Sequence, residues 1–311
     1  MTDIYNIVFP GQGSQRPGMG SDFSEKYAES REIFARASEA LKEDIAQICF
    51  TENEKLDLTE YTQPCILTCS IAMYHAIRTE IPLSGELFAG HSLGEYTALV
   101  AAGVFSLEDA VKIVRRRGAL MQQAVPAGVG AMAALIADDL QTLDVQKIIE
   151  ANGAEIANLN STSQTVISGN RDAVEKASAA LKLQWPQIEV IFLNVSAPFH
   201  SSLMKSIERE FHDYLSSFSP NFTMEKVGKV ASNYSGKLHD EKNLINHLVS
   251  QISGSVRWLD NMKLLIANKL PVFEIGPNKP LSKFFGTLGA PVTSVINLRS
   301  LKPLLSAVTQ K

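Results

Sequence analysis

The stretch of sequence that decides the fold is FAGHSLGEYTALVAAGVF, residues 88–105. It runs from an apolar segment through a Gly-His-Ser-Leu-Gly turn into a pattern typical of a helix. Gly90 and Gly94 permit a sharp turn between strand and helix that exposes Ser92 on a strained corner. Amides at the start of the following helix point outward, and one of them can stabilise an oxyanion. The pattern indicates a nucleophilic serine at a strand end of an α/β fold; a glycine-rich turn with a solvent-facing serine is the alternative.

The bulk composition is that of an ordinary soluble enzyme. The chain has 311 residues, of which 45% are hydrophobic and 20% charged, so it can bury a large core without disulfides or a metal. A net charge of −4 gives no overall attraction to nucleic acid or anionic membranes. The N-terminus lacks the long apolar region of a signal peptide, and no apolar run approaches the roughly 18 residues of a spanning helix. We therefore predict a cytoplasmic protein that binds neither nucleic acid nor membrane.

The chain has three cysteines, Cys49, Cys65 and Cys69. The last two lie four residues apart in an apolar stretch, with no nearby His or Cys cluster that would complete a metal site. We predict that they are buried as small hydrophobic side chains in a reducing compartment, and that the protein holds no metal.

Most of the chain shows the alternation of a parallel α/β body. A glycine-rich loop, PGQGSQRPGMG, follows the first expected strand, and Ser106 is the expected N-cap of one helix. We expect strands at 4–9, 86–90 and 272–275, and helices over 24–49, 62–80, 95–105 and 106–125.

In the middle of the chain the expected order of strands and helices changes, which predicts a separate subdomain. Its expected order is strand, helix, strand, strand, helix, strand, which is the ferredoxin-like pattern. The strands are expected at 130–136, 155–161, 164–170 and 189–196, and the helices at 138–151 and 171–183. We predict a ferredoxin-like subdomain over 128–197, inserted in an α/β hydrolase-like body formed by 1–127 and 198–311.

A nucleophilic serine needs a base, and the position of His200 suits that role. It comes directly after an expected strand and before a helix, where catalytic groups often lie. His91 adjoins Ser92 but is expected to point away from it, as a structural residue. We expect the remaining histidines at the surface: His75, His212, His239 and His247. No carboxylate between Ser92 and His200 stands at an obvious strand end, so something other than an acid is expected to orient the base.

Six blocks of sequence together resemble the malonyl-CoA:acyl carrier protein transacylases of bacterial type II fatty acid synthesis. They are FPGQGSQRPGMG, GHSLGEYTALVAAGV, RRRGALMQQAVPAGVGAMAALI, NSTSQTVISGN, VSAPFHSSLM and FEIGPNKPLSKF. They stand in the order seen in that family and extend over nearly the whole chain. The resemblance implies a hydrolase-like α/β body with an inserted ferredoxin-like subdomain, in agreement with the pattern of elements.

The resemblance also implies roles for individual residues. Ser92 matches the nucleophile that carries the malonyl ester, and His200 matches its base. Gln251 matches the residue whose main-chain carbonyl orients that histidine, which accounts for the missing acid. The backbone amides of Gln12 and Leu93 match the two oxyanion donors, which gives the early glycine loop a purpose.

Two further residues match groups that bind the substrate. Arg117 matches the arginine that holds the malonyl carboxylate, and a planar guanidinium can bind a carboxylate through two bonds. A solvated basic helix face is the alternative for the Arg-Arg-Arg run, and it is kept for Arg115 and Arg116, because helical spacing places the three side chains on different faces. Phe199 resembles an aromatic residue that crowds an α-methyl group and favours malonyl.

The activity implied is malonyl transfer through an acyl-serine, with malonyl-CoA and an acyl carrier protein as substrates and no cofactor. We predict a monomer. Carrier proteins of this class are acidic, and five basic residues follow Pro271 against one acid, Glu274; a scattered solvated surface explains them equally well. The basic residues are Lys279, Lys283, Arg299, Lys302 and Lys311.

Three other functions stay open from the sequence. A serine thioesterase would explain Ser92 but leaves Arg117 without a role. A transacylase for another ester, such as methylmalonyl-CoA, differs by one methyl group, which a pocket distinguishes by roughly 1–3 kcal/mol. A carrier-binding subunit without activity would not need an intact serine and histidine.

Overall fold

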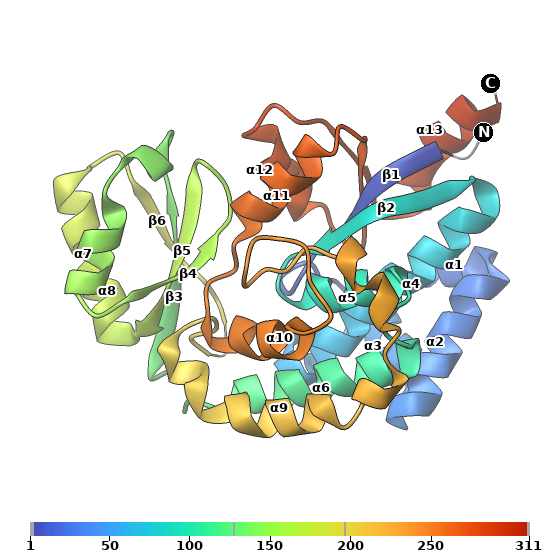
Figure 1. Cartoon of the computed structure of the whole chain (residues 1–311), viewed down its shortest axis with the longest axis horizontal. Helices are drawn as coiled ribbons and strands as arrows, with labels where there is room; N and C mark the ends of the chain where they lie inside the picture. The colour runs from blue at the N-terminus through green and yellow to red at the C-terminus, as the bar shows by residue number, and fades with distance from the viewer. Residues whose placement is uncertain (1–2, 127, 196, 310–311) are drawn as a thin grey trace.

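A parallel sheet forms the body of the molecule in the computed structural model, which describes residues 3–126, 128–195 and 197–309 (Figure 1). Its strand order is β2-β1-β7-β8, and every neighbouring pair is parallel. The strands are β1 (Asp3–Phe9), β2 (Leu83–Gly90), β7 (Val272–Ile275) and β8 (Val292–Val295). The predicted parallel sheet is confirmed, and three of its strands were expected from the sequence.

Both faces of this sheet are buried, because alternate side chains of β1 enter different cores. Ile7 and Phe9 join the large core, while Val8 packs on the opposite face. The large core is covered mainly by α4 (Thr59–Glu80), α5 (Leu93–Ala101) and α6 (Leu107–Gln123). The other face is covered by α11 (Trp258–Ala267) and α12 (Pro280–Gly286). Burial on both faces is typical of a parallel sheet.

The helix expected over 24–49 is wrong as a single element. The structure has α1 (Ser21–Lys26), α2 (Ala28–Leu41) and α3 (Ile45–Phe50). Tyr27 is extended at φ −113° and ψ 129°, and Lys42 ends α2 in the left-handed region at φ 53°. The Asp44 carboxylate then accepts from the amide of Gln47 and starts α3, as a polar N-cap does.

The small sheet is antiparallel throughout, with the order β4-β5-β3-β6. It carries α7 (Val145–Ala151) and α8 (Arg171–Gln184), and this order confirms the ferredoxin-like prediction. The strands are β3 (Gly130–Ile136), β4 (Glu155–Leu159), β5 (Gln164–Asn170) and β6 (Glu189–Phe192). The strand expected over 189–196 ends earlier, at Phe192, and position 196 lies outside the described residues. The helix expected from 138 begins at Val145, after a 3-10 turn at Leu140–Thr142.

The small sheet packs with one face on its own helices and the other on the body. Ala133 and Leu135 of β3 lie in the core with α7 and α8, whereas Met132 and Ala134 join the large core. The body also extends this sheet, because the amide of Val256 donates to Ala157 at 2.8 Å. The predicted division into 128–197 and the rest fits two sheets, but one boundary falls at position 127, outside the described residues, so the limits stay a prediction.

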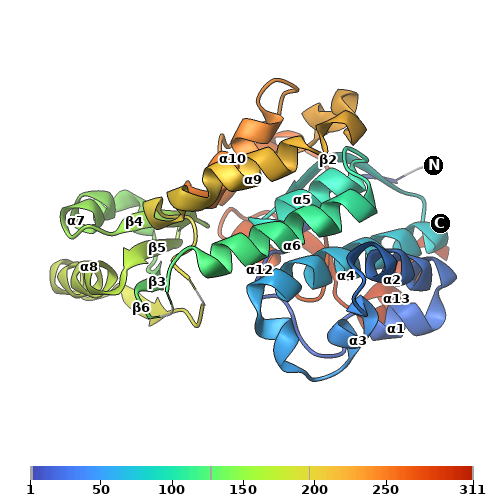
Figure 2. The same cartoon turned by 90° about the horizontal axis from the view of Figure 1, so that it is seen from below.

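The remaining helices link or cover these two parts. Figure 2 shows α9 (Glu208–Ser216) alongside α6, where Arg116 forms an ion pair with Glu210. Two other helices are α10 (Leu244–Ser253) and α13 (Leu298–Thr309). Further 3-10 turns are Glu54–Asp57, Ser202–Ile207, Ser219–Asn221 and Met224–Lys229. Among the described residues, no helix has the length and apolar character needed to cross a membrane.

Candidate active site

Ser92 occupies a strained turn between β2 and α5, at φ 51° and ψ −103°. The turn is possible because glycines allow unusually close backbone approach. A Cβ added at Gly90 would lie 2.0 Å from the backbone of Gly94, and one at Gly94 would lie 2.2 Å from the carbonyl oxygen of Phe9. These separations are far inside van der Waals contact, so each glycine is required by its surroundings. The geometry is that of the turn predicted from residues 88–105.

The side chain of Asn233, which belongs to a distant part of the chain, forms hydrogen bonds to two residues of this turn. Its Oδ1 accepts from the amide of Ser92 at 2.6 Å, and its Nδ2 donates to the carbonyl of Gly90 at 2.8 Å. The same Nδ2 donates to Asn261 Oδ1 at 2.9 Å, and the main-chain amide of Asn233 donates to Glu95 Oε2 at 3.0 Å. Asn233 is fully buried, so water does not compete for these bonds. They hold both sides of the strained backbone.

His200 contacts the hydroxyl of Ser92, and its ring is held in one orientation. Ser92 Oγ and His200 Nε2 are 2.8 Å apart, and His200 Nδ1 is 2.7 Å from the carbonyl oxygen of Gln251. A carbonyl oxygen only accepts, so Nδ1 carries the proton and Nε2 presents its lone pair to the serine. This tautomer can accept the serine proton. The orienting group is a main-chain carbonyl, so the arrangement needs no carboxylate.

The surroundings keep His200 uncharged. Burial lowers its pKa to about 3, and the positive charge of Arg117 acts in the same direction, while the carbonyl of Gln251 opposes the shift. A histidine with this pKa is neutral near pH 7 and is available as a base.

Two unpartnered amides face the same region. The amide of Ser92 is occupied by Asn233, so it is not available to an oxyanion. Among the described residues, the amides of Gln12 and Leu93 have no acceptor, and both residues line the cleft that contains Ser92. The loop with Gln12 lies against the serine turn, since a Cβ at Gly11 would be 2.2 Å from the carbonyl oxygen of His91. The geometry suits a pair of oxyanion donors.

Arg117 turns inward from α6 and is almost fully buried. Its Nη1 donates to Gln63 Oε1 at 2.9 Å, and its Nη2 donates to Gln251 Oε1 at 2.8 Å and to Ser92 Oγ at 3.1 Å. Its Nε is buried and has no acceptor in the described part of the chain. Arg116 instead pairs with an acid on α9. The three consecutive arginines therefore point in different directions, as helical spacing predicts, and only Arg117 reaches the serine.

A cleft of about 710 Å³ lies between the two parts of the molecule. Ser92, His200 and Arg117 line it, and so does Met132 of the small sheet. Phe199 lines it as well and is 8% exposed. The structure therefore brings together in one cleft Ser92, His200, Arg117 and Phe199, to which the sequence analysis gave catalytic or substrate-binding roles as expectations.

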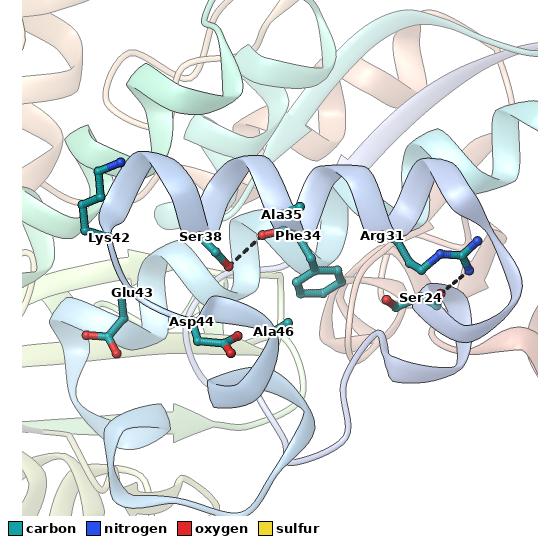
Figure 3. Close-up of a pocket in the computed structure, with 9 residues that line it drawn as sticks. All are labelled: Ser24, Arg31, Phe34, Ala35, Ser38, Lys42, Glu43, Asp44 and Ala46. Atoms are coloured by element: carbon teal, nitrogen blue, oxygen red, sulfur yellow. Dashed lines mark hydrogen bonds between the residues drawn. The ribbon is translucent and has the colours of Figure 1, made fainter.

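A second hollow, of about 510 Å³, lies between α1, α2 and α3 and shares no lining residue with the cleft (Figure 3). Its polar groups serve local structure: Arg31 donates to the carbonyl of Ser24 at 2.8 Å, and the Ser38 hydroxyl donates to the carbonyl of Phe34 at 2.8 Å. Asp44 caps α3. We find no catalytic arrangement there. Within the described residues, no three His, Cys, Asp or Glu side chains are grouped to hold a metal.

Comparison with known proteins identifies the family. Residues 6–271 match the acyl transferase domain family. The malonyl CoA-acyl carrier protein transacylase of Staphylococcus aureus (strain MRSA252) is 38% identical over 304 residues, 95% of this chain and 96% of that protein. The chain belongs to the malonyl CoA-acyl carrier protein transacylase family. It is an acyltransferase, and the resemblance seen in the sequence is confirmed.

Solved transacylases share the whole fold. The crystal structure of the enzyme from Clostridium perfringens has a TM-score of 0.90 and 36% identity, covering 99% of this chain and 98% of that chain. A malonyl-transacylase solved in complex with its type II PKS acyl-carrier protein has a TM-score of 0.90 and 31% identity, covering 98% of this chain and 99% of that chain. These matches confirm the predicted fold class.

Sequence reasoning missed several polar residues that surround the site. The expectation that His239 lies at the surface is wrong: it is 3% exposed, and its Nε2 is 2.6 Å from Glu95 Oε1. Glu95, Asn233 and Gln63 are also buried and were not singled out. One signal was available, because Glu95 is the only charged residue in the stretch 88–105 and stands among apolar neighbours. His91 bonds Asn160 of the small subdomain at 2.7 Å.

The role of Asn233 in the turn can be tested by Asn233→Ala. The change leaves the Ser92 amide and the Gly90 carbonyl without partners, at a cost of about 1–3 kcal/mol each. We expect a lower midpoint of denaturation and at least roughly tenfold slower labelling of Ser92 by a fluorophosphonate, measured where the variant is folded. The control is Asn261→Ala, which removes bonds to Asn233 and to the Ser232 carbonyl but none to the turn. Equal labelling rates in the two folded variants would contradict the role of Asn233.

The low pKa of His200 predicts an unusual pH profile. A base that is protonated only near pH 3 stays active as the pH falls through about 6.5, the ordinary histidine value. We expect the rate of Ser92 labelling by an uncharged fluorophosphonate to be retained to about pH 5. Arg117→Gln removes a charge that lowers this pKa, so its acid limb should shift to higher pH. A wild-type labelling rate that falls to half its maximum near pH 6.5 would show that the pKa of His200 is not lowered.

Proposed function

We propose that this chain transfers a malonyl group from malonyl-CoA to the phosphopantetheine thiol of an acyl carrier protein, through an ester on Ser92. The observation that carries the proposal is the buried guanidinium of Arg117, 3.1 Å from Ser92 Oγ. The names of the relatives, which are malonyl CoA-acyl carrier protein transacylases, support it.

Arg117 has the features of a group that awaits an anion. Its acceptors are the Ser92 hydroxyl and the neutral amide oxygens of Gln63 and Gln251, and it forms no ion pair with any described carboxylate. A buried charge is costly unless it is paired, and its Nε has a free bonding position. A substrate carboxylate would supply both the charge and the acceptor.

The proposed reaction has two matched halves. His200 Nε2 takes the proton of Ser92 as Oγ attacks the thioester carbonyl, and the amides of Gln12 and Leu93 bind the resulting oxyanion. When the tetrahedral intermediate collapses, the C–S bond breaks and the CoA thiol leaves with the proton from His200. The carrier thiol then gives its proton to His200 and attacks the ester carbonyl. When the C–O bond breaks, Ser92 Oγ leaves with the proton from His200. The carbonyl of Gln251 keeps the same ring tautomer in both halves.

Phe199 is the proposed selector against substituted malonyl groups. It lines the cleft directly before His200, where its ring would crowd an α-methyl group. The discrimination against methylmalonyl-CoA should be modest, because one methyl group changes binding by roughly 1–3 kcal/mol.

The surface after Pro271 supports an acidic partner. The one acid of this segment, Glu274, is buried and accepts from the amides of Leu281 and Ser282 and from the Ser294 hydroxyl. The basic residues described there are exposed at Lys279, Lys283, Arg299 and Lys302, while Lys311 lies outside the described residues. We propose that they help to steer the carrier protein. We also propose that the enzyme acts in the cytoplasm as a monomer and without a cofactor.

The covalent step is tested by intact-protein mass spectrometry after mixing with malonyl-CoA alone. We expect a malonyl adduct on Ser92 in the wild type and none in Ser92→Ala. Arg117→Ala should acylate roughly 10- to 100-fold more slowly, because a charge-assisted pair is lost. Arg116→Ala is the matched control, since it removes a neighbouring surface arginine, and it should react like the wild type.

Two outcomes would contradict the proposed function. Release of CoA without an adduct would mean rapid hydrolysis and would favour a thioesterase. No adduct and no CoA release would show that malonyl-CoA is not the donor.

A further inference from the structure

Glu95 is a buried carboxylate that the proposed reaction does not use. It stands in the first turn of α5 and is fully buried. Its Oε1 is 2.6 Å from His239 Nε2, and its Oε2 accepts from Gln251 Nε2 at 2.6 Å and from the amide of Asn233 at 3.0 Å. A carboxylate with this many donors is held in one position.

The bond from Gln251 determines which way that side-chain amide faces. A carboxylate only accepts, so the amino end of Gln251 must face Glu95. The same Nε2 also donates to the carbonyl of Ser92 at 3.1 Å. The oxygen is then left for Arg117, whose Nη2 donates to it at 2.8 Å. If the amide were reversed, an NH₂ group would face the guanidinium and both would be donors.

We propose that Glu95 is a positioning residue that acts through the side chain of Gln251 to fix the guanidinium of Arg117, and so sets the preference for carboxylated over plain acyl groups. The inference rests on the proposed function and assigns to Gln251 a second role besides its main-chain carbonyl.

The Gln251 amide lies between the charges of Glu95 and Arg117. This placement leaves the guanidinium of Arg117 able to bind a substrate carboxylate. A direct ion pair with Glu95 would occupy the N–H groups that a substrate carboxylate needs. The intervening Gln251 holds the guanidinium by a neutral oxygen, while the negative charge of Glu95 lies behind it and partly offsets the burial of the arginine. Burial lowers the pKa of Arg117, and Tyr96 and Glu95 act in the opposite direction.

The test uses the variant Glu95→Gln. It compares the acylation of Ser92 by malonyl-CoA with its acylation by acetyl-CoA. This change keeps the size of the side chain but removes the charge and the obligatory acceptor, so Gln251 is no longer held in one orientation. We expect the ratio of kcat/KM for malonyl-CoA to that for acetyl-CoA to fall roughly tenfold or more, chiefly through KM for malonyl-CoA, with acetyl-CoA changed by less than about twofold.

His239→Gln is the matched control. It alters the partner of the other oxygen of Glu95 and leaves the bond to Gln251 in place, so it should lower the midpoint of thermal denaturation without changing the ratio. Gln251→Met keeps the main-chain carbonyl for His200 and removes the amide, and it should reproduce the loss of selectivity. The double variant Glu95→Gln, Gln251→Met should be no less selective than Gln251→Met alone. If Glu95→Gln does not fold, the selectivity of Gln251→Met decides the matter.

Three results separate the possible failures. A wild-type ratio in folded Glu95→Gln, or in Gln251→Met, would overturn the inference. An equal loss for both esters would also overturn it and would assign Glu95 a structural role only. A wild-type enzyme that acquires no malonyl adduct would instead refute the proposed function, on which the inference depends.

Discussion

The rest of the site depends on the close backbone contact at the serine turn, where β1, β2 and the start of α5 approach one another more closely than any Cβ permits. Gly94 lies against the carbonyl of Phe9, and Gly11 lies against the carbonyl of His91. This contact lays the loop after β1 beside Ser92, which is how the Gln12 and Leu93 amides come to share one cleft. Hydrogen bonds from Asn233, on a distant part of the chain, stabilise the strained backbone of the turn.

A second constraint is charge burial around that turn. Arg117 and Glu95 are both almost wholly removed from water, yet they do not form an ion pair with each other. Gln251 connects them through its side chain and orients His200 through its main chain. One residue of α10 thus links the base, the guanidinium and the buried acid, so these groups depend on one another.

The architecture was largely predictable because it follows from local patterns. The β-α-β-β-α-β order of the middle segment gave the ferredoxin-like subdomain, and the turn at 90–94 gave the serine its strand end and helix start. The failures were also local: residues 24–49 form three helices because Tyr27 and Lys42 adopt non-helical backbone angles that the apolar pattern does not encode. The prediction that His239 lies at the surface was wrong because the polar residues around it in the sequence do not indicate that its side chain contacts a buried carboxylate.

The sequence by itself determined the chemistry available: a serine between glycines, a histidine after a strand, and a run of three arginines of which helical spacing allows only one into a cleft. Only the tertiary structure decided which groups meet. The Gln251 carbonyl on the ring of His200, the Asn233 amide across the turn, and Glu95 behind Gln251 join residues more than fifty positions apart. Hydrogen bonds of this kind form only when the donor–acceptor distance is correct to within a few tenths of an ångström. Tertiary packing sets that distance, and spacing along the chain does not specify it.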